Sequence, residues 1–139
     1  MAVIIEKFNI TTEGFSNTID VTDKVISIVK EKNLENAFVE VISPYETMSV
    51  ILANSDRNFV SDLINFLDNL FPINRNYSYD SVSKEANAAA ILKANYLKSS
   101  ASISFLRGNP ILLNNQRILA IDFDFKMGNQ KEILVNIIY

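Results

Sequence analysis

The sequence predicts an α+β fold in which three helices pack on a largely antiparallel sheet. In some segments the apolar residues recur every two residues, as in strands, and in others about every 3.6 residues, as in helices. The resulting elements run in the order strand, helix, two strands, two helices and four strands. A doubly wound parallel sheet would alternate strands with helices, and a sandwich would consist of strands. The length of 139 residues is typical of one domain, so we expect a single domain over 1–139.

The first half of the chain is expected to form a strand, a helix and two further strands. β-Branched residues over 2–14 predict a strand that closes in a turn. Within 17–33 the apolar residues recur at helical spacing, and Thr22 is placed to cap this helix. Two short apolar stretches at 37–43 and 47–53 predict strands separated by a polar step.

The second half is expected to begin with helices and end in strands. Residues 55–72 have apolar positions at helical spacing until Pro72 ends the helix. Polar and aromatic residues without a period predict a loop over 73–85, and strong helix formers predict a third helix within 83–99. Four strands complete the chain, at 101–108, 109–114, 116–125 and 131–139.

Histidine and cysteine are both absent. The chain can therefore form no Ser-His or Cys-His dyad and no imidazole or thiolate metal site. Acid–base chemistry would depend on Asp, Glu, Lys or Tyr side chains with shifted pKa values. A metal bound by side chains would be a hard ion such as Mg²⁺ with oxygen ligands. No cofactor is expected, and Mg²⁺ enters only if the chain is an enzyme with a rebuilt site.

The charge distribution argues against nucleic acid and membrane partners. The net charge is −3, the isoelectric point is near 4.9, and no run of Lys or Arg forms a basic patch. Residues 1–10 lack the basic start and cleavage site of a signal peptide. No apolar stretch approaches the roughly 18 residues of a membrane span. We therefore expect a cytoplasmic protein.

Two carboxylates on the predicted strand 116–125 are candidates for a site. Asp122 and Asp124 alternate along the strand and so point from the same face. They could form a paired acid–base or cation site. Antiparallel sheets commonly have one face in water, so a solvated face is the alternative that the pattern favours.

Two polar segments in loops are weaker candidates. Tyr79 lies in the aromatic loop 77–80, where phenol groups could line a pocket or simply lie at the surface. Asp56 and Arg57 precede the second predicted helix, whose start favours anions. A single acid at such a position more often caps the helix.

Five segments, in the same order and at similar spacing, resemble the YjbQ-like family, also called the secondary thiamine-phosphate synthase family. The segments are TIDVTDKV, AFVEVISPYETMSV, NYSYDS, EANAAAILKANYL and RGNPILLNNQRILAIDFD. The resemblance covers nearly the whole chain. It implies a YjbQ-like domain over 1–139 and a homotrimer whose site residues gather near subunit contacts.

The departures from the family pattern fall at its chemical positions. The residues at the family's three histidines are Tyr45, Tyr79 and Ile91; Glu46, Ala86 and Asn115 replace threonine, glycine and tryptophan. The matching residues are Thr47, Asn87, Gln116, Asp122 and Asp124. A tyrosine with its ordinary pKa of about 10 is a poor proton shuttle at neutral pH, and isoleucine has no polar group.

Three functions remain open on the sequence. The first is a degenerate homotrimer without the family's histidine chemistry, with a structural role or a small polar, anionic or phosphorylated ligand; its binding residues would be Tyr45, Thr47, Tyr79, Asn87 and Gln116. The second is an enzyme, thiamine-phosphate-synthase-like, whose acids or Mg²⁺ ligands would come from Glu46, Asp56, Asp122 and Asp124. The third is a protein-interaction module.

Overall fold

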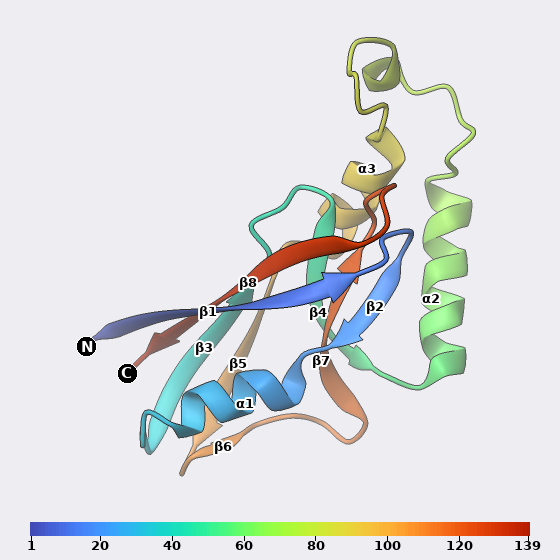
Figure 1. Cartoon of the computed structure of the whole chain (residues 1–139). Helices are drawn as coiled ribbons and strands as arrows, with labels where there is room; N and C mark the ends of the chain where they lie inside the picture. Colours follow the sequence, from blue (N-terminus) through green and yellow to red (C-terminus); the bar gives the residue numbers. More distant parts are fainter.

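The computed structural model describes residues 1–139 as a chain of alternating strands and helices (Figure 1). The strands are β1 (Val3–Thr12), β2 (Asn17–Asp20), β3 (Asn36–Ile42), β4 (Met48–Asn54), β5 (Ser100–Leu106), β6 (Asn109–Pro110), β7 (Gln116–Asp122) and β8 (Asn129–Ile138). The helices are α1 (Thr22–Lys30), α2 (Arg57–Leu70) and α3 (Ala88–Leu97), with a 3₁₀ turn η1 (Ser78–Ser81). None of these helices is long and apolar enough to cross a bilayer.

The strands form two antiparallel sheets. One has five strands in the order β1-β8-β3-β5-β6, and the other has three in the order β2-β7-β4. The predicted α+β class with three helices and a largely antiparallel arrangement is confirmed. The division into two sheets was not predicted, because periodicity indicates which face of a strand is buried but not which strands pair with it. Strand β1 is an edge that pairs only with β8.

The main core lies between the two sheets and against α1. From the five-stranded sheet, β8 contributes Ile133, Val135 and Ile137, which are fully buried. From the other sheet, β7 contributes Ile118 and Ala120. The predicted apolar face of α1 packs against this core through Val25, Ile28 and Val29, which are buried.

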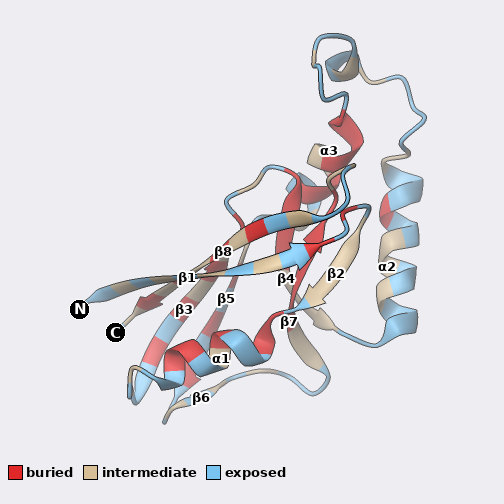
Figure 2. Cartoon of the chain, viewed as in Figure 1, coloured by how far each residue is buried: buried red, intermediate tan, exposed pale blue.

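A second, smaller core lies on the opposite face of the three-stranded sheet. It joins Ile121 and Phe123, at the end of β7, to Leu67 of α2 and to Ala90 and Ala94 of α3. Helix α2 reaches this core through Leu67, its single buried residue and the short red segment in Figure 2, and through the partly buried Leu63. The N-terminal half of α2 is therefore held less closely to the sheet than its C-terminal half.

The prediction that Asp122 and Asp124 lie on a solvated face of their strand is wrong. Residues from Ile118 to Phe123 are all buried, because β7 has a core on each side. The five-stranded sheet covers the face that carries Ile118, Ala120 and Asp122, and helices α2 and α3 cover the opposite face of the strand. The sequence pattern alone cannot reveal this second layer.

Three local details also differ from expectation. Strand β2 lies within the segment expected to form the first helix; it has only four residues, and three of them are polar. Thr22 is not the helix cap; its buried Oγ1 accepts a hydrogen bond from the N–H of Ile118 at 2.7 Å. The strand expected over 109–114 is limited to Asn109–Pro110. In contrast, Asp56 caps α2 as expected, accepting from the N–H of Asn58 at 2.8 Å.

Candidate functional site

The polar step between β3 and β4 packs against the ends of β7 and β8. The carbonyl of Thr47 accepts a hydrogen bond from the N–H of Phe123 at 2.8 Å. The Tyr45 hydroxyl accepts one from the N–H of Glu132 at 2.8 Å. Thr47 is buried and Tyr45 half-buried. The first family histidine position is thus tied by backbone contacts to the start of β8.

Lys131 lies over the Tyr45 ring. Its Nζ is 4.5 Å from the centre of the Tyr45 ring, a cation–π contact. The same Nζ is 3.2 Å from Asp124 Oδ2, and the Lys131 side chain is only 9% exposed. The three side chains thus form a compact group in which an ammonium joins a phenol ring to a carboxylate.

Sequence reasoning missed Lys131, although a signal for it existed. Residues 131, 133, 135 and 137 alternate along β8, and the last three are core residues. A lysine in phase with Ile133 and Val135 had to point inward as well. A charge on the core-facing phase of a strand marks an ion pair or a site.

Asp122 is a structural residue. Its carboxylate, with the residue fully buried, accepts hydrogen bonds from the Thr12 hydroxyl, from Asn129 Nδ2 at 3.1 Å and from the N–H of Asp124 at 3.0 Å. Both oxygens are therefore engaged, and the group links the end of β7 to the end of β1 and the start of β8. A carboxylate held in this way has no free oxygen for a proton or a ligand.

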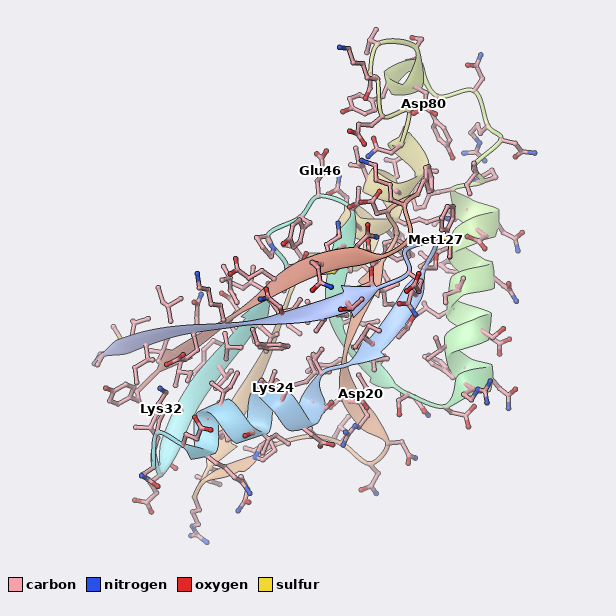
Figure 3. The ribbon with its side chains drawn as sticks, in the orientation of Figure 1. Asp20, Lys24, Lys32, Glu46, Asp80 and Met127 are labelled. Atoms are coloured by element: carbon pink, nitrogen blue, oxygen red, sulfur yellow. The ribbon has the colours of Figure 1, made fainter.

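The other candidate carboxylates are scattered. Glu46 projects from the exposed loop between β3 and β4 (Figure 3), Asp124 is paired with Lys131, and Asp56 caps α2. No group of three or more Asp or Glu side chains is arranged to hold a metal ion. The geometry therefore brings together none of the carboxylate clusters expected for a rebuilt acid–base site.

The other two replaced histidine positions share a different pocket. Tyr79, on η1, and Ile91, on α3, line a cavity of about 270 Å³ together with Tyr77, Ala88 and Leu92. The Tyr77 hydroxyl donates to the carbonyl of Pro72 at 2.8 Å, which fixes that ring. The walls of this cavity are mainly apolar and aromatic. It can hold a planar apolar group but supplies no proton shuttle.

Asn87 lies beside this pocket, at the start of α3. The residue is 6% exposed, and its Oδ1 is buried without a hydrogen-bond partner. The first helical N–H, that of Ala88, donates to Asp80 Oδ1 at 2.9 Å. Asp80 belongs to the loop beyond this end of the helix (Figure 3). A carboxylate thus already occupies the helix end that favours anions.

Gln116 lies apart from the other matching residues. It begins β7, whereas Asp122 ends it, so the two lie about 20 Å apart along the strand. Its Oε1 accepts from the N–H of Leu113 at 3.1 Å, and across the sheet it pairs with Asn54. Within one chain the expected binding residues are therefore in three places: around Tyr45, around Tyr79 and Asn87, and at Gln116.

Comparisons with known proteins agree with this fold. A family model described as "UPF0047 protein YjbQ-like" matches residues 6–139. A UPF0047 protein of Archaeoglobus fulgidus is 31% identical over 106 residues, covering 76% of this chain and 80% of that protein. A UPF0047 protein of Methanocaldococcus jannaschii is 29% identical over 119 residues, covering 85% of this chain and 83% of that protein.

Solved structures show the same arrangement of elements. A YbjQ-like protein of unknown function from Sulfolobus solfataricus superposes with a TM-score of 0.90 at 19% identity, covering 98% of this chain and 96% of that one. A yjbq/upf0047 family protein from Clostridium acetobutylicum gives 0.87 at 26% identity, covering 96% and 99%.

The Asp122 linkage predicts a stability effect without any assay of function. Asp122→Ala should lower the free energy of unfolding by ~2–4 kcal/mol, because it leaves buried donors without an acceptor. Urea unfolding measures the change. The control Glu46→Ala removes an exposed carboxylate and should stay within about 0.5 kcal/mol of the parent. An equal, small effect of the two substitutions would contradict a structural role for Asp122.

Proposed function

The chain belongs to the UPF0047 YjbQ-like protein family, and we propose that it has lost that family's histidine chemistry and serves as a binding protein for a small polar ligand. The observation that carries this proposal is the fate of the three histidine positions. Tyr45, Tyr79 and Ile91 stand there, and none of the three positions holds an imidazole. In this view the chain is one YjbQ-like domain over 1–139 and acts in the cytoplasm.

The Tyr45 position supports loss of proton transfer. Its hydroxyl receives a backbone N–H, and its ring lies against a lysine whose charge is paired with Asp124. These contacts stabilise a fixed phenol ring. An imidazole is the side chain that most readily exchanges protons near neutral pH, and this position holds a phenol instead.

The pocket lined by Tyr79 and Ile91 supports retained binding. It presents aromatic walls beside a helix start at which Asn87 Oδ1 has no partner. The N–H groups of Ala89 and Ala90, in the first turn, have no hydrogen-bond acceptor in the chain either. A ligand with a planar ring and a polar edge suits these features: the ring would lie on the tyrosine, and the polar edge would face the helix start.

The charge at the helix start limits the kind of ligand. An anion there would meet Asp80, which already accepts from the N–H of Ala88. Like charges at this distance repel, so a phosphorylated ligand has to displace Asp80 from the helix end. An unphosphorylated polar ring meets no such penalty.

Gln116 supports assembly as a homotrimer. The family resemblance groups Gln116 with Tyr45, Tyr79 and Asn87 in one site. Within a chain it lies about 20 Å from the Asp122 end of β7. A neighbouring copy can supply the missing residue, so we propose that each site combines the Tyr79 pocket of one chain with Gln116 of the next.

One observation favours the alternative of an active enzyme. Lys131, Asp124 and Tyr45 form a largely buried group of an ammonium, a carboxylate and a phenol at a position that the resemblance assigns to the site. Such a group could move protons if a substrate reached it. The carboxylate is, however, already paired with the ammonium, and Asp122 has no free oxygen.

Ligand binding at the Tyr79 pocket predicts thermal stabilisation that depends on Ile91. The probes are the uncharged thiazole alcohol, thiamine phosphate, its pyrimidine and thiazole phosphate precursors, pyrophosphate and sulfate, each with and without Mg²⁺. A probe at about 100 times its Kd adds about 2.7 kcal/mol and raises the melting midpoint. Ile91→Trp should abolish this shift by filling the pocket.

Val82→Trp is the matched control, since Val82 is 83% exposed and does not line the pocket. It should leave the shift unchanged. If no probe raises the melting midpoint, the proposed ligand binding is wrong. If the shift persists in Ile91→Trp, the ligand binds at a site other than the Tyr79 pocket.

The Asp80 carboxylate predicts a difference between phosphorylated and unphosphorylated probes. Asp80→Asn keeps an oxygen acceptor for Ala88 and removes the negative charge. It should tighten binding of the phosphorylated thiazole precursor about fivefold and leave the corresponding uncharged thiazole alcohol unchanged. Isothermal titration of both ligands gives the two affinities. Equal changes for the two would place the phosphate away from α3.

The shared site predicts complementation between two defective chains. Sedimentation should give three times the chain mass of 15.7 kDa. Gln116→Ala and Ile91→Trp should each abolish the ligand-induced shift. Refolding an equal mixture should restore binding at about one site in four, where an intact pocket meets an intact Gln116. A monomer mass, or a mixture that stays inactive, would argue against sites shared between chains.

A further inference from the structure

The largest cavity of the molecule lies outside the residues discussed so far. It has a volume of about 520 Å³ and lies between the N-terminal half of α2 and the strands β2 and β7 (Figure 1). Pockets for small molecules typically measure about 300–1,000 Å³. None of its lining residues lines the Tyr79 pocket. Its size alone makes it a candidate site, and its lining indicates the ligand.

The floor of this α2 groove is apolar. Leu119, which is 2% exposed, lies below, and Val60 and Ile64 face it from α2. None of the three belongs to either hydrophobic core. Because α2 meets the second core through Leu67, near its C-terminal end, its inward side chains nearer the N-terminus line open space. An apolar group placed there would pack against these side chains and bury apolar surface.

The rim of the groove is polar and has one free charge. Thr18, Ser55 and Ser61 supply hydroxyl groups. The guanidinium of Arg57 has no carboxylate within ion-pair distance in the chain. The neighbouring Asp56 carboxylate is directed to the backbone N–H groups of Asn58 and Phe59.

The other charge in the groove, Asp20, is paired with Arg117, which also contacts Asp23 Oδ1 at 3.1 Å. Arg117 Nε lies 2.8 Å from Asp20 Oδ2, and the N–H of Thr22 donates to Asp20 Oδ1 at 3.0 Å. Burial alone would raise the pKa of Asp20, but the hydrogen bonds from Thr22 and Arg117 outweigh it and hold the pKa below the ordinary value of 3.8. Asp20 therefore stays ionised and paired at neutral pH, which leaves Arg57 as the cation without a partner.

We propose that the α2 groove binds a small organic anion, whose apolar body lies on Leu119, Val60 and Ile64 and whose anionic group pairs with Arg57. The hydroxyls of Ser55 and Ser61 add hydrogen bonds at the rim. This site does not depend on the function proposed above, because it shares no residue with the Tyr79 pocket or with Gln116. It assigns a role to the one large cavity that the family positions do not use.

A set of three probes of one shape tests the proposal: 3-phenylpropionate, the neutral 3-phenylpropan-1-ol and the cationic 3-phenylpropylamine. Backbone amide shifts in ¹⁵N spectra report both the location and the affinity of each. The acid should bind most tightly and shift residues of α2 and β2. Arg57→Gln should weaken the acid about fivefold, as for a partly exposed ion pair, and leave the alcohol unchanged. Arg107→Gln, at a distant turn, is the matched control and should change neither.

Ser61→Trp provides a second test, because Ser61 is an exposed lining residue and the larger ring should close the groove. Binding of all three probes should then be lost with an unchanged melting midpoint. Equal affinity for the acid and the amine, or shifts confined to other surfaces, would overturn the proposal. A Ser61→Trp variant that changes the mass of the assembly would also overturn it, since a second copy of the chain would then cover the groove.

Discussion

The burial of β7 on both faces is the constraint on which the rest of the structure depends. One face contributes Ile118 and Ala120 to the main core, and the other contributes Leu119 and Ile121 to the side covered by α2 and α3. The strand is thus the shared wall of two layers. Where it ends, a charged residue enters the interior, and Asp122 is acceptable there only because every oxygen has a donor. The same end of β7 carries the loop of Tyr45 and Thr47, so the family site is built on the most constrained part of the molecule.

The three positions expected to have lost an imidazole have different surroundings. Tyr45 packs at the surface of the main core and contacts Lys131 and the backbone of Glu132. Tyr79 and Ile91 line a mainly apolar cavity at the edge of α3. None of the three positions carries the buried linkage of Asp122. Function and stability are therefore held by different residues, although these residues lie close together.

Much of the fold could be predicted because its elements have clear periods. The residues that face inward on α1 and β8 recur as the period requires, and Asp56 caps α2 through ordinary local chemistry. The failures have a common origin in contacts between distant segments. Thr22 looked like a helix cap, but it bonds to Ile118, 96 residues away in sequence. The expected wet face around Asp122 is covered by the five-stranded sheet, whose β1 and β8 contact Asp122 through Thr12 and Asn129. The inward position of Lys131 follows from its strand, because it is in phase with the buried residues Ile133 and Val135 of β8.

The position of β1 has a consequence for the behaviour of the protein in concentrated solution. This ten-residue strand is bonded on one side only, so its other side presents a row of backbone donors and acceptors. Val3 and Ile5, which are 57% and 67% exposed, add an apolar surface at its start, and the charge of Lys7 is the main deterrent along it. Such an edge is a template for adding another strand, and proteins commonly protect it with charges, bulges or a covering segment. The solubility of this chain therefore rests on how well a single lysine, or a neighbouring subunit, protects one edge of one sheet.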